Sequence, residues 1–286
     1  MPNDQLNLFD GIEPSVRLPL RLGHAEIEAS STRSILTRTT GFMSDYDYSL
    51  NPYSGCSYGC SYCYAAFFVR DDQKRESWGN WVIVKENALQ VLRKMRTDLR
   101  GKTVYMSSVT DPYQPIERRL KLVRSLLEEL LGRGVRLVVQ TRSPLVVRDI
   151  DLLKQFEHVR VNMTVGTDSR AVQKVFEPHC PSPRVRLKAI GQVHESGIQS
   201  CITLTPLLPV SNPIKFVHEL RETKVQQFVV QPFHLSRGKF VAGTRPEALR
   251  IAAEMNWTDE KYREFVRLMK QELPVVEEGR EGFSPE

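Results

Sequence analysis

The sequence has little of what marks a membrane or secreted protein. No apolar stretch in its 286 residues approaches the roughly 18 residues that a membrane-spanning helix needs. The first ten residues lack the basic segment and the apolar segment of a secretory signal. The chain has only five cysteines, which at this length argues against a disulfide framework and for a reducing compartment. We therefore expect a cytoplasmic protein.

A second C-x2-C pair is also missing, which weakens a zinc interpretation. Structural zinc sites bind four ligands, usually from two such pairs or from one pair and two histidines. Three of the five cysteines lie within eight residues, in the spacing C-x3-C-x2-C: Cys56, Cys60 and Cys63. Only residues distant in sequence, Cys180, Cys201 or His179, are left to supply a fourth ligand. A zinc-stabilised, non-catalytic nucleic-acid-binding protein stays open as an alternative.

Three thiolates from one short loop suit a cubic [4Fe-4S] cluster better. They would bind three of its irons, and the missing fourth cysteine leaves one iron open for another ligand. Clusters that only transfer electrons normally have four cysteine ligands. Gly55 and Gly59 fit such a loop, because a backbone wrapped closely around a cluster needs positive φ angles. An open iron indicates catalysis.

Basic side chains outnumber acidic ones. The chain has 40 Lys and Arg against 34 Asp and Glu, a net charge of +6, and the basic residues are spread along it. This permits a polyanionic partner such as nucleic acid without requiring one.

The apolar pattern predicts an α/β fold, because short β-branched runs alternate with helical stretches, as in βα units around a parallel sheet. We expect a loosely ordered arm over residues 1–40, a core domain over 41–240 and a helical extension over 241–286. The extension ends in a Glu-rich stretch from Pro274 that we expect to fray.

Six βα units predict a partial (β/α)6 TIM-like barrel with flanking terminal helices. Working residues of such barrels follow the C-terminal ends of the strands, and the cysteine loop follows the first one. The expected strands are 46–51, 103–109, 135–140, 159–165, 199–205 and 226–231. The expected helices are 84–99, 120–131, 150–156, 183–196, 213–221, 246–255 and 258–273.

The cysteine spacing, with aromatic Tyr62 directly before the last cysteine, resembles the cluster loop of the radical S-adenosylmethionine superfamily. The resemblance implies that the open iron chelates the amine and carboxylate of S-adenosyl-L-methionine. One electron, delivered by a donor of the flavodoxin or ferredoxin type, would cleave this cofactor to a 5'-deoxyadenosyl radical that abstracts hydrogen from a substrate. We place Tyr62 among the cofactor-binding residues. The radical chemistry belongs to the cofactor, and the protein positions the reacting groups and excludes water.

Further segments resemble the subgroup related to spore photoproduct lyase, a DNA-repair enzyme that reverses a thymine dimer. The resemblance covers most of residues 35 to 235 and implies lyase-like chemistry, with nucleic acid as the first expectation for a substrate. A protein, peptide or small-molecule substrate is the alternative. The segments that carry it are 51–53, 110–115, 141–144, 177–183 and 206–209.

The resemblance also implies roles at the strand ends. Thr110 and Asp111 lie in the loop after the second strand, which in the superfamily approaches the methionyl amine of the cofactor. A carboxylate there can accept a hydrogen bond from the ammonium group. The alternative is that the Asp-Pro pair only makes a turn. Arg142 stands where the subgroup often has a basic residue that pairs the cofactor carboxylate, a task that suits the guanidinium fork.

Polar residues on later strands are further candidates. Asn162 and Thr164 share one side of the fourth strand, so they either contact the ribose or form a hydrogen-bonded polar layer. Tyr64 either packs on the cluster or adenine or is an ordinary core aromatic. Weaker candidates for adenine or substrate contact follow the fifth and sixth strands: Thr205, Leu207, Gln231 and His234.

Ser108 departs from the pattern of the subgroup. Its counterpart there, three residues before the aspartate, is a cysteine that gives a hydrogen atom to the product radical. An alcohol O–H bond is far too strong for that step, so Cys201 or Cys180 becomes the candidate hydrogen donor. A buried strand cysteine is, however, more often a small hydrophobe. The sequence therefore predicts the radical machinery without predicting dimer repair.

Overall fold

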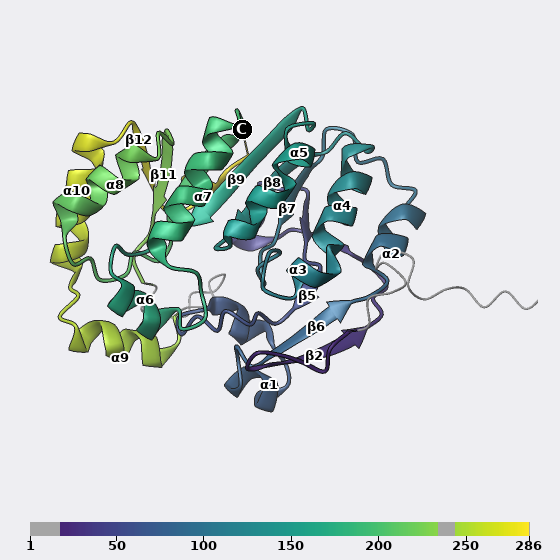
Figure 1. The fold of residues 1–286 in the computed structure, drawn as a ribbon, viewed down its shortest axis with the longest axis horizontal. Coiled ribbons are helices and arrows are strands. Elements are labelled where there is room, and N and C mark those ends of the chain that lie inside the picture. The colour runs from purple at the N-terminus through teal and green to yellow at the C-terminus, as the bar shows by residue number, and fades with distance from the viewer. Residues whose placement is uncertain (1–17, 234–243, 286) are drawn as a thin grey trace, which may run out of the picture.

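The computed structural model describes residues 18–233 and 244–285, and its largest element is an eight-stranded sheet (Figure 1). In chain order its strands are β3 (Leu36–Arg38), β4 (Tyr48–Leu50), β7 (Thr103–Met106), β8 (Arg136–Thr141), β9 (His158–Thr164), β10 (Gln199–Leu204), β11 (Gln227–Val230) and β12 (Val275–Glu278). The spatial order is β12-β11-β10-β9-β8-β7-β4-β3. All neighbours from β4 to β12 are parallel, and β3 is antiparallel at the edge.

This sheet confirms the predicted α/β fold and partial barrel. The six predicted strands are β4 and β7 to β11, each within a few residues of its expected bounds. The helices are α1 (Asp72–Glu76), α2 (Ala88–Lys94), α3 (Glu117–Leu120), α4 (Leu122–Leu131), α5 (Ile150–Leu153), α6 (Arg170–Phe176), α7 (Pro183–Glu195), α8 (Pro213–Glu222), α9 (Pro246–Glu254) and α10 (Asp259–Glu272).

Helices cover one face of the sheet and leave the other to polar side chains. In Figure 1, α4, α5 and α7 lie in front of the sheet, and α7 packs against β9 and β10. Ile190 and Val193 of α7 share a core with Val161 and Met163 of β9. The alternate residues of these strands therefore face the barrel interior. No helix within the described ranges combines the length and apolarity needed to cross a bilayer.

A second, smaller sheet was missed by the sequence analysis. It has the order β1-β2-β6-β5, from β1 (Arg21–Leu22), β2 (Ala25–Ser30), β5 (Tyr53–Ser54) and β6 (Trp81–Lys85). The predicted helix over 84–99 is correspondingly wrong at its start. The expected loosely ordered arm over 1–40 is wrong for residues 21–38, while residues 1–17 lie outside the described chain. The pairing of β2 with β6 joins segments about 55 residues apart, as Glu26 with Trp81, which local patterns do not reveal.

The C-terminal end is also more ordered than expected. Val275–Glu278 does not fray but pairs in parallel with β11, so the extension over 241–286 is not purely helical. Beyond it, the carbonyl of Phe283 accepts hydrogen bonds from Tyr46 and from the buried Arg160. Arg280 forms an ion pair with Asp45. These contacts tie the segment after β12 to the segment before β4, at the N-terminal end of the barrel.

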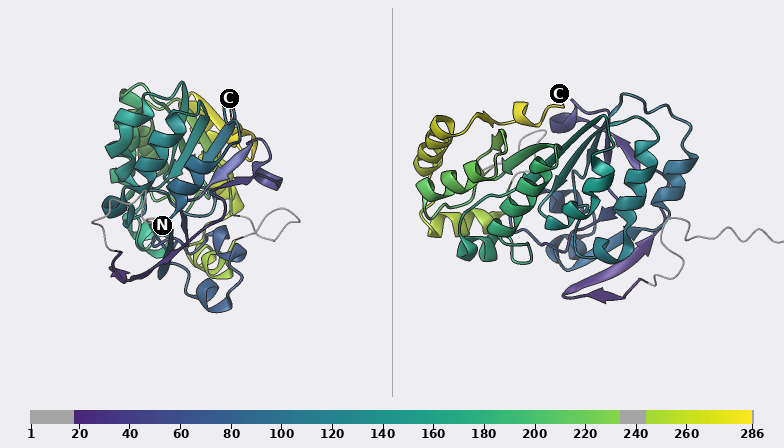
Figure 2. Two further views of the ribbon diagram at one scale, coloured as in Figure 1. Left: turned by 90° about the vertical axis from the view of Figure 1, so that its right-hand side faces the viewer. Right: turned by 45° about the horizontal axis from the view of Figure 1, so that its top comes forward.

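The opposite end of the barrel carries the cysteine loop. The small sheet, α1, α6 and α9 gather around this end in both Figure 1 and Figure 2. The cysteines Cys56 and Cys60 share one buried apolar cluster with Trp81 of β6, Phe176 of α6 and Ile251 of α9. The smaller elements therefore form a cover over the strand ends.

Candidate functional site

The cysteine loop rests on the loop that follows β7. Gln114 is fully buried, and its Oε1 accepts a hydrogen bond from the backbone N–H of Ser57 (3.0 Å). The Thr110 hydroxyl donates to the Gly55 carbonyl (2.6 Å). Tyr58 in turn donates through its hydroxyl to the Tyr113 carbonyl (3.3 Å). The conformation of the cysteine loop is thus held by side chains of segment 110–115. The role of this glutamine has no local signal in the sequence.

The three thiols on this loop fit the ligand set of a cluster. They are reduced; Cys56 and Cys60 are buried, and Cys63 is partly exposed. Gly55 has φ +74°, and a Cβ there would lie 2.5 Å from the Trp81 ring. The backbone therefore passes closer to its cover than any other residue type allows, as a loop wrapped around a cluster requires.

We predict that Gly55→Ala impairs folding of this loop more than Gly101→Ala does. Both positions have positive φ, +74° and +70°, but nothing lies within 4 Å of a Cβ at Gly101. The control carries only the backbone strain, on the order of 1 kcal/mol, whereas Gly55→Ala adds the clash with Trp81. Urea unfolding of the cluster-free chain and iron uptake measure the difference. Equal losses in the two variants would contradict the close packing at Gly55.

Asn51, directly after β4, holds the start of the loop after β7. Its Oδ1 accepts from the N–H groups of Ser108 (3.0 Å) and Val109 (3.1 Å), and its Nδ2 donates to the Ser108 hydroxyl (3.3 Å). Tyr64 donates to the Ser108 carbonyl and is 45% exposed, so it is not an ordinary core aromatic. Ser108 therefore lies beside the cysteine loop, and contact of Tyr64 with the cluster or adenine stays a prediction.

Asp111 joins the ends of two strands. Its buried carboxylate accepts from the Tyr113 N–H (2.9 Å), the Thr141 hydroxyl (2.7 Å) and the Arg142 N–H (2.7 Å). Burial raises the pKa of Asp111, against these hydrogen bonds, which act to lower it. The bond to Tyr113 is the Asx turn that the sequence left as an alternative. The predicted contacts of Thr110 and Asp111 with the cofactor amine stay predictions.

Arg142 and Tyr62 meet in a buried charged cluster, which with Glu177 and Arg186 we call the Glu177 network. Arg142 Nη2 donates to the Tyr62 hydroxyl (3.2 Å), and its Nε lies 3.5 Å from Glu177 Oε1. Glu177 also accepts from Tyr62 and from Arg186. Arg186 donates further to the carbonyls of Pro181 (2.8 Å) and Thr164 (3.1 Å). The structure therefore brings two predicted cofactor-binding residues together beside Cys60.

The charges in this network are held in their ionised forms. Burial acts to raise the pKa of Glu177, but Arg186 and Arg142 outweigh it and lower that pKa. Burial acts to lower the pKa of Arg142, but Tyr62, Cys60 and Glu177 raise it well above its usual value. Arg142 Nε is buried and faces Glu177 Oε1 in the ion pair, so this carboxylate fixes the orientation of the guanidinium. Glu177 and Arg186 could not be predicted as part of the site, because nothing local in the sequence marks them as partners.

Asn162 and Thr164 lie in the barrel interior but differ in their partners. Thr164 Oγ1 accepts from Gln140 Nε2 (2.7 Å) and bonds to the Thr203 hydroxyl (2.9 Å), which is the polar layer given as the alternative. Asn162 faces the Tyr105 hydroxyl, but that group donates to Gln140 Oε1 (2.9 Å). The fully buried Asn162 amide makes no hydrogen bond of normal geometry within the described chain. Ribose contact for either residue stays a prediction.

The weaker candidates differ in their burial. Thr205 is half-buried at the end of β10, Leu207 and Gln231 are buried, and His234 lies outside the described residues. Cys201 stands four residues before Thr205, about 13 Å along the strand, and packs against Val229 and Phe283. The structure does not bring Cys201 to the cysteine loop, and its role as hydrogen donor stays a prediction.

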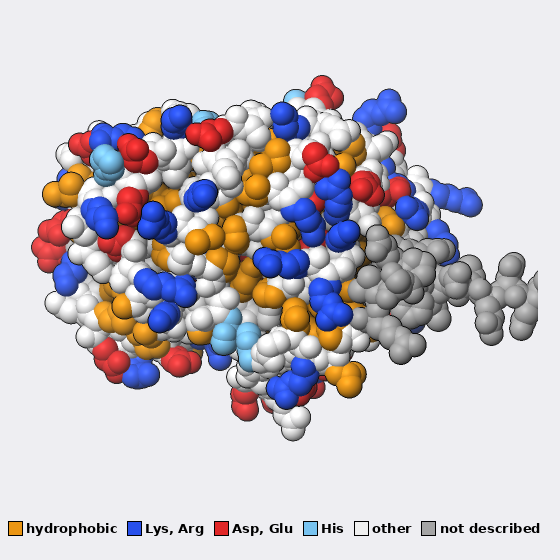
Figure 3. Space-filling model, viewed as in Figure 1, with side chains coloured by type: hydrophobic (Ala, Val, Ile, Leu, Met, Phe, Trp, Pro, Cys, Tyr) orange, Lys and Arg blue, Asp and Glu red, His pale blue; other side chains and the backbone are white. Residues whose placement is uncertain are grey.

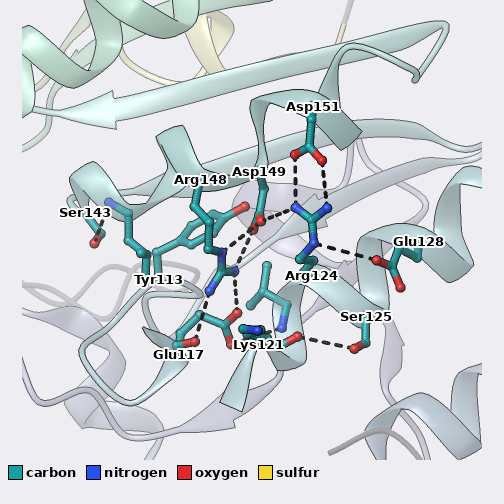
Figure 4. A network of polar contacts seen from close by, with 12 residues as sticks. Tyr113, Glu117, Lys121, Arg124, Ser125, Glu128, Ser143, Arg148, Asp149 and Asp151 are labelled. Atoms are coloured by element: carbon teal, nitrogen blue, oxygen red, sulfur yellow. Dashed lines mark hydrogen bonds and ion pairs between the residues drawn. The ribbon is translucent and has the colours of Figure 1, made fainter. Parts of the chain in front are cut away.

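A second network of polar contacts lies around the buried carboxylates of Glu117 and Asp149 (Figure 4). Glu117 is fully buried and accepts from Tyr53 of β5 (2.5 Å) and from Arg148 (2.7 Å). Arg148 also pairs with buried Asp149, which is shared with Arg124 (3.0 Å). These ion pairs join β5, α3 and α4 through charges that have no direct contact with the cysteines.

The barrel, the three-thiol loop and the buried arginine define a class of protein, an enzyme that works with a cluster at the strand ends of an α/β barrel. Comparison with known families makes this specific. The family model described as the radical SAM superfamily matches residues 50–222, more than half of the chain. The chain therefore belongs to the radical SAM superfamily, whose members use a [4Fe-4S] cluster and S-adenosylmethionine. The zinc-stabilised, non-catalytic alternative is set aside.

Individual relatives share parts of this chain. An uncharacterized protein of Methanocaldococcus jannaschii is 37% identical over 177 residues, 62% of this chain and 66% of that protein. An uncharacterized protein of Acidianus two-tailed virus is 29% identical, covering 61% of this chain and 60% of that one. The chain thus matches less than two thirds of the length of these curated relatives.

Solved structures show the same fold. A mutant of spore photoproduct lyase superposes with a TM-score of 0.62 at 15% identity, over 87% of this chain and 81% of that one. Another mutant of that enzyme, solved with AdoMet and a dinucleoside spore photoproduct, gives a TM-score of 0.61. At this identity the likeness supports the predicted spore photoproduct lyase-like fold.

Proposed function

We propose that this chain cleaves S-adenosylmethionine reductively and abstracts a hydrogen atom from a nucleic-acid substrate at the strand ends of its barrel. The observation that carries the proposal is the loop of Cys56, Cys60 and Cys63, held beside Arg142 at those strand ends. Cys56, Cys60 and Cys63 would hold three irons of the cluster, and the bound cluster would supply the single electron for reductive cleavage of the cofactor.

The residues of the chain hold the thiol loop, orient Arg142 and shield the cysteines from water. Gln114 and Thr110 fix the loop that presents the thiols, and the Glu177 network aims Arg142. Arg142 holds a positive charge beside the cysteines, which suits the carboxylate of the cofactor. Tyr62 and Trp81 belong to the apolar cover that excludes water from the cysteines. Water exclusion matters because a radical must meet only its substrate.

The support for nucleic acid comes from charge and from fold. The chain has a net charge of +6, and Arg245 at the start of α9 lies near enough to Cys63 for its charge to act on that thiol. On the face drawn in Figure 3, Lys and Arg side chains are spread among other groups rather than gathered in one block. The fold is that of spore photoproduct lyase, which has been solved with a dinucleoside spore photoproduct. Dimer repair itself is not proposed, because Ser108 replaces the thiol.

Cofactor cleavage is tested by anaerobic reconstitution with iron and sulfide, followed by dithionite and S-adenosylmethionine. We expect a brown protein with about four irons per chain and release of 5'-deoxyadenosine. A fully loaded protein that releases none would refute the proposed reaction. A colourless preparation that binds one zinc would refute the cluster itself.

For substrate binding, we predict that affinity for single- or double-stranded DNA falls steeply between low and moderate salt. Each phosphate contact adds about 0.7 to 0.9 to the slope of log affinity against log salt. Arg245→Ala should lower this slope by about one contact, whereas Arg263→Ala, on the exposed side of α10, should leave it unchanged. Fluorescence anisotropy at several salt concentrations measures both. No binding at low salt would redirect the search to a protein, peptide or small molecule.

A further inference from the structure

A fourth cysteine lies against the cysteine loop. Cys180, in the segment between α6 and α7, has its Sγ 3.7 Å from Sγ of Cys60, and both side chains are buried. The two residues are 120 positions apart, so only the fold brings them together. None of the roles assigned above uses Cys180 at this place.

The contact is held from both sides. The Cys180 N–H donates to the Glu177 carbonyl (3.1 Å), and Gln173 Nε2 donates to the Cys180 carbonyl (3.1 Å). On the other side, the Ser61 N–H donates to the Phe176 carbonyl (2.8 Å), which ties the cysteine loop to the end of α6. These hydrogen bonds hold the two backbone segments beside each other, and the two sulfurs meet between them.

The bond to iron decides which sulfur carries the hydrogen of this contact. Both side chains lie in one buried apolar group with Tyr62, Trp78 and Phe176. Cys60 binds iron as a thiolate. Cys180 must then be the S–H donor of the pair, and Cys60 the acceptor.

The cluster chemistry also excludes Cys180 as a ligand on the same iron. An iron that is bonded to three sulfides and the Cys60 thiolate has no place for a second thiolate. A sulfur 3.7 Å from Cys60 is thus placed to act on this ligand.

We propose that Cys180 is a positioning residue that donates an S–H···S hydrogen bond to the Cys60 thiolate and raises the reduction potential of the cluster. Hydrogen bonds to the sulfurs are one of the levers that set this potential. Reduction adds negative charge to the cluster, so the bond strengthens in the reduced state and favours it. The inference rests on the proposed cluster at Cys56, Cys60 and Cys63.

The test is an anaerobic redox titration followed by electron paramagnetic resonance on the reconstituted full chain. Cys180→Ala should bind as much iron as the wild type but be reduced at a more negative potential, by about tenfold in the one-electron equilibrium, or about 59 mV. Cys180→Ser, which restores a donor, should recover most of the shift. Val172→Ala removes apolar volume from the buried hydrophobic group around Cys60 and Cys180 but removes no hydrogen-bond donor. It should leave the reduction potential unchanged.

Two results of this titration would overturn the proposal. An unchanged potential in Cys180→Ala would show that no hydrogen bond is made. A loss of about one iron per chain would show that Cys180 is a ligand instead.

A measurement on the cluster-free chain tests the contact separately from the cluster. Hydrogen peroxide should oxidise Cys60 and Cys180 to one disulfide: the two thiols lose two electrons and two protons, and the peroxide becomes two waters. Peptide mapping under non-reducing conditions identifies the pair. Pairing of Cys60 mainly with Cys56 or Cys63 would contradict the geometry. A chain that forms the Cys60–Cys180 disulfide but never takes up iron would refute the proposed function, and with it the tuning role, while leaving the contact established.

Discussion

Replacing Cys60 by alanine is expected to abolish release of 5'-deoxyadenosine and to bleach the reconstituted protein. Two thiolates remain on the loop, and a cluster with two of its irons unligated by the chain is not retained. Cys60 is also the most enclosed of the three, since its sulfur contacts Cys180 and its neighbours tie the loop to α6. Iron analysis, the visible spectrum and chromatography of the nucleoside product measure the loss.

A matched comparison separates this effect from general damage. Val185→Ala, on the exposed side of α7, should load iron and release the nucleoside at the wild-type rate. Circular dichroism of the cluster-free Cys60→Ala chain should match the wild type, because the thiol fills little of the core. Release at the wild-type rate from Cys60→Ala would refute the assignment of the cluster to this loop.

The parts of the fold that sequence predicted are those with local signals. Residues 226–231 and 199–205 are β-branched runs with glycine or polar residues at their ends, and both became central parallel strands. The helix α10 follows its N-cap Thr258, whose hydroxyl accepts a hydrogen bond from the Lys261 N–H, close to the start predicted at residue 258.

The missed elements depend on distant partners. The run Trp81–Lys85 is short, and its last two residues fall in the predicted helix over 84–99, yet it pairs with both β2 and β5. Glu277 and Glu278 look like a solvated end, but the backbone around them pairs with Val229 and Val230. A strand of four residues with charged side chains has no periodicity of its own. Only the neighbouring strand defines it.

The candidate site also has one part that the local sequence reveals and one part that only the fold reveals. The cysteines could be read because all three ligands lie in one segment, so their spacing is itself the signal. The residues that support them come from elsewhere: Gln114 is 57 positions from Ser57, and Glu177 is 115 from Tyr62. Glu177 stands before a proline and reads as a loop residue. Its importance lies in two buried arginines that the sequence places 9 and 35 positions away.

That placement predicts a large loss of stability when Glu177 is replaced by alanine. The change leaves Arg186, which is 0% exposed, and the mostly buried Arg142 without their carboxylate. Removing one partner of a buried ion pair typically costs about 3–5 kcal/mol, because the remaining charge is uncompensated. The carbonyls of Pro181 and Thr164 stay bonded to Arg186 and place the expected loss at the lower end of this range. Urea unfolding of the reduced, cluster-free chain measures it as a lower midpoint with an unchanged slope.

Two further variants show whether the loss of stability comes from the uncompensated charge of the buried arginine. Glu219→Ala breaks an exposed ion pair with Lys215 on α8, and pairs of this kind contribute about 0–1 kcal/mol, so its midpoint should barely move. The double variant Glu177→Leu with Arg186→Met removes both buried charges and should be less destabilised than the sum of its single variants. A midpoint for Glu177→Ala close to that of Glu219→Ala would contradict the network, because Arg186 would then be satisfied by carbonyls alone. An additive double variant would show that the two charges do not interact, and Arg142 would have to be held beside Cys60 by Tyr62.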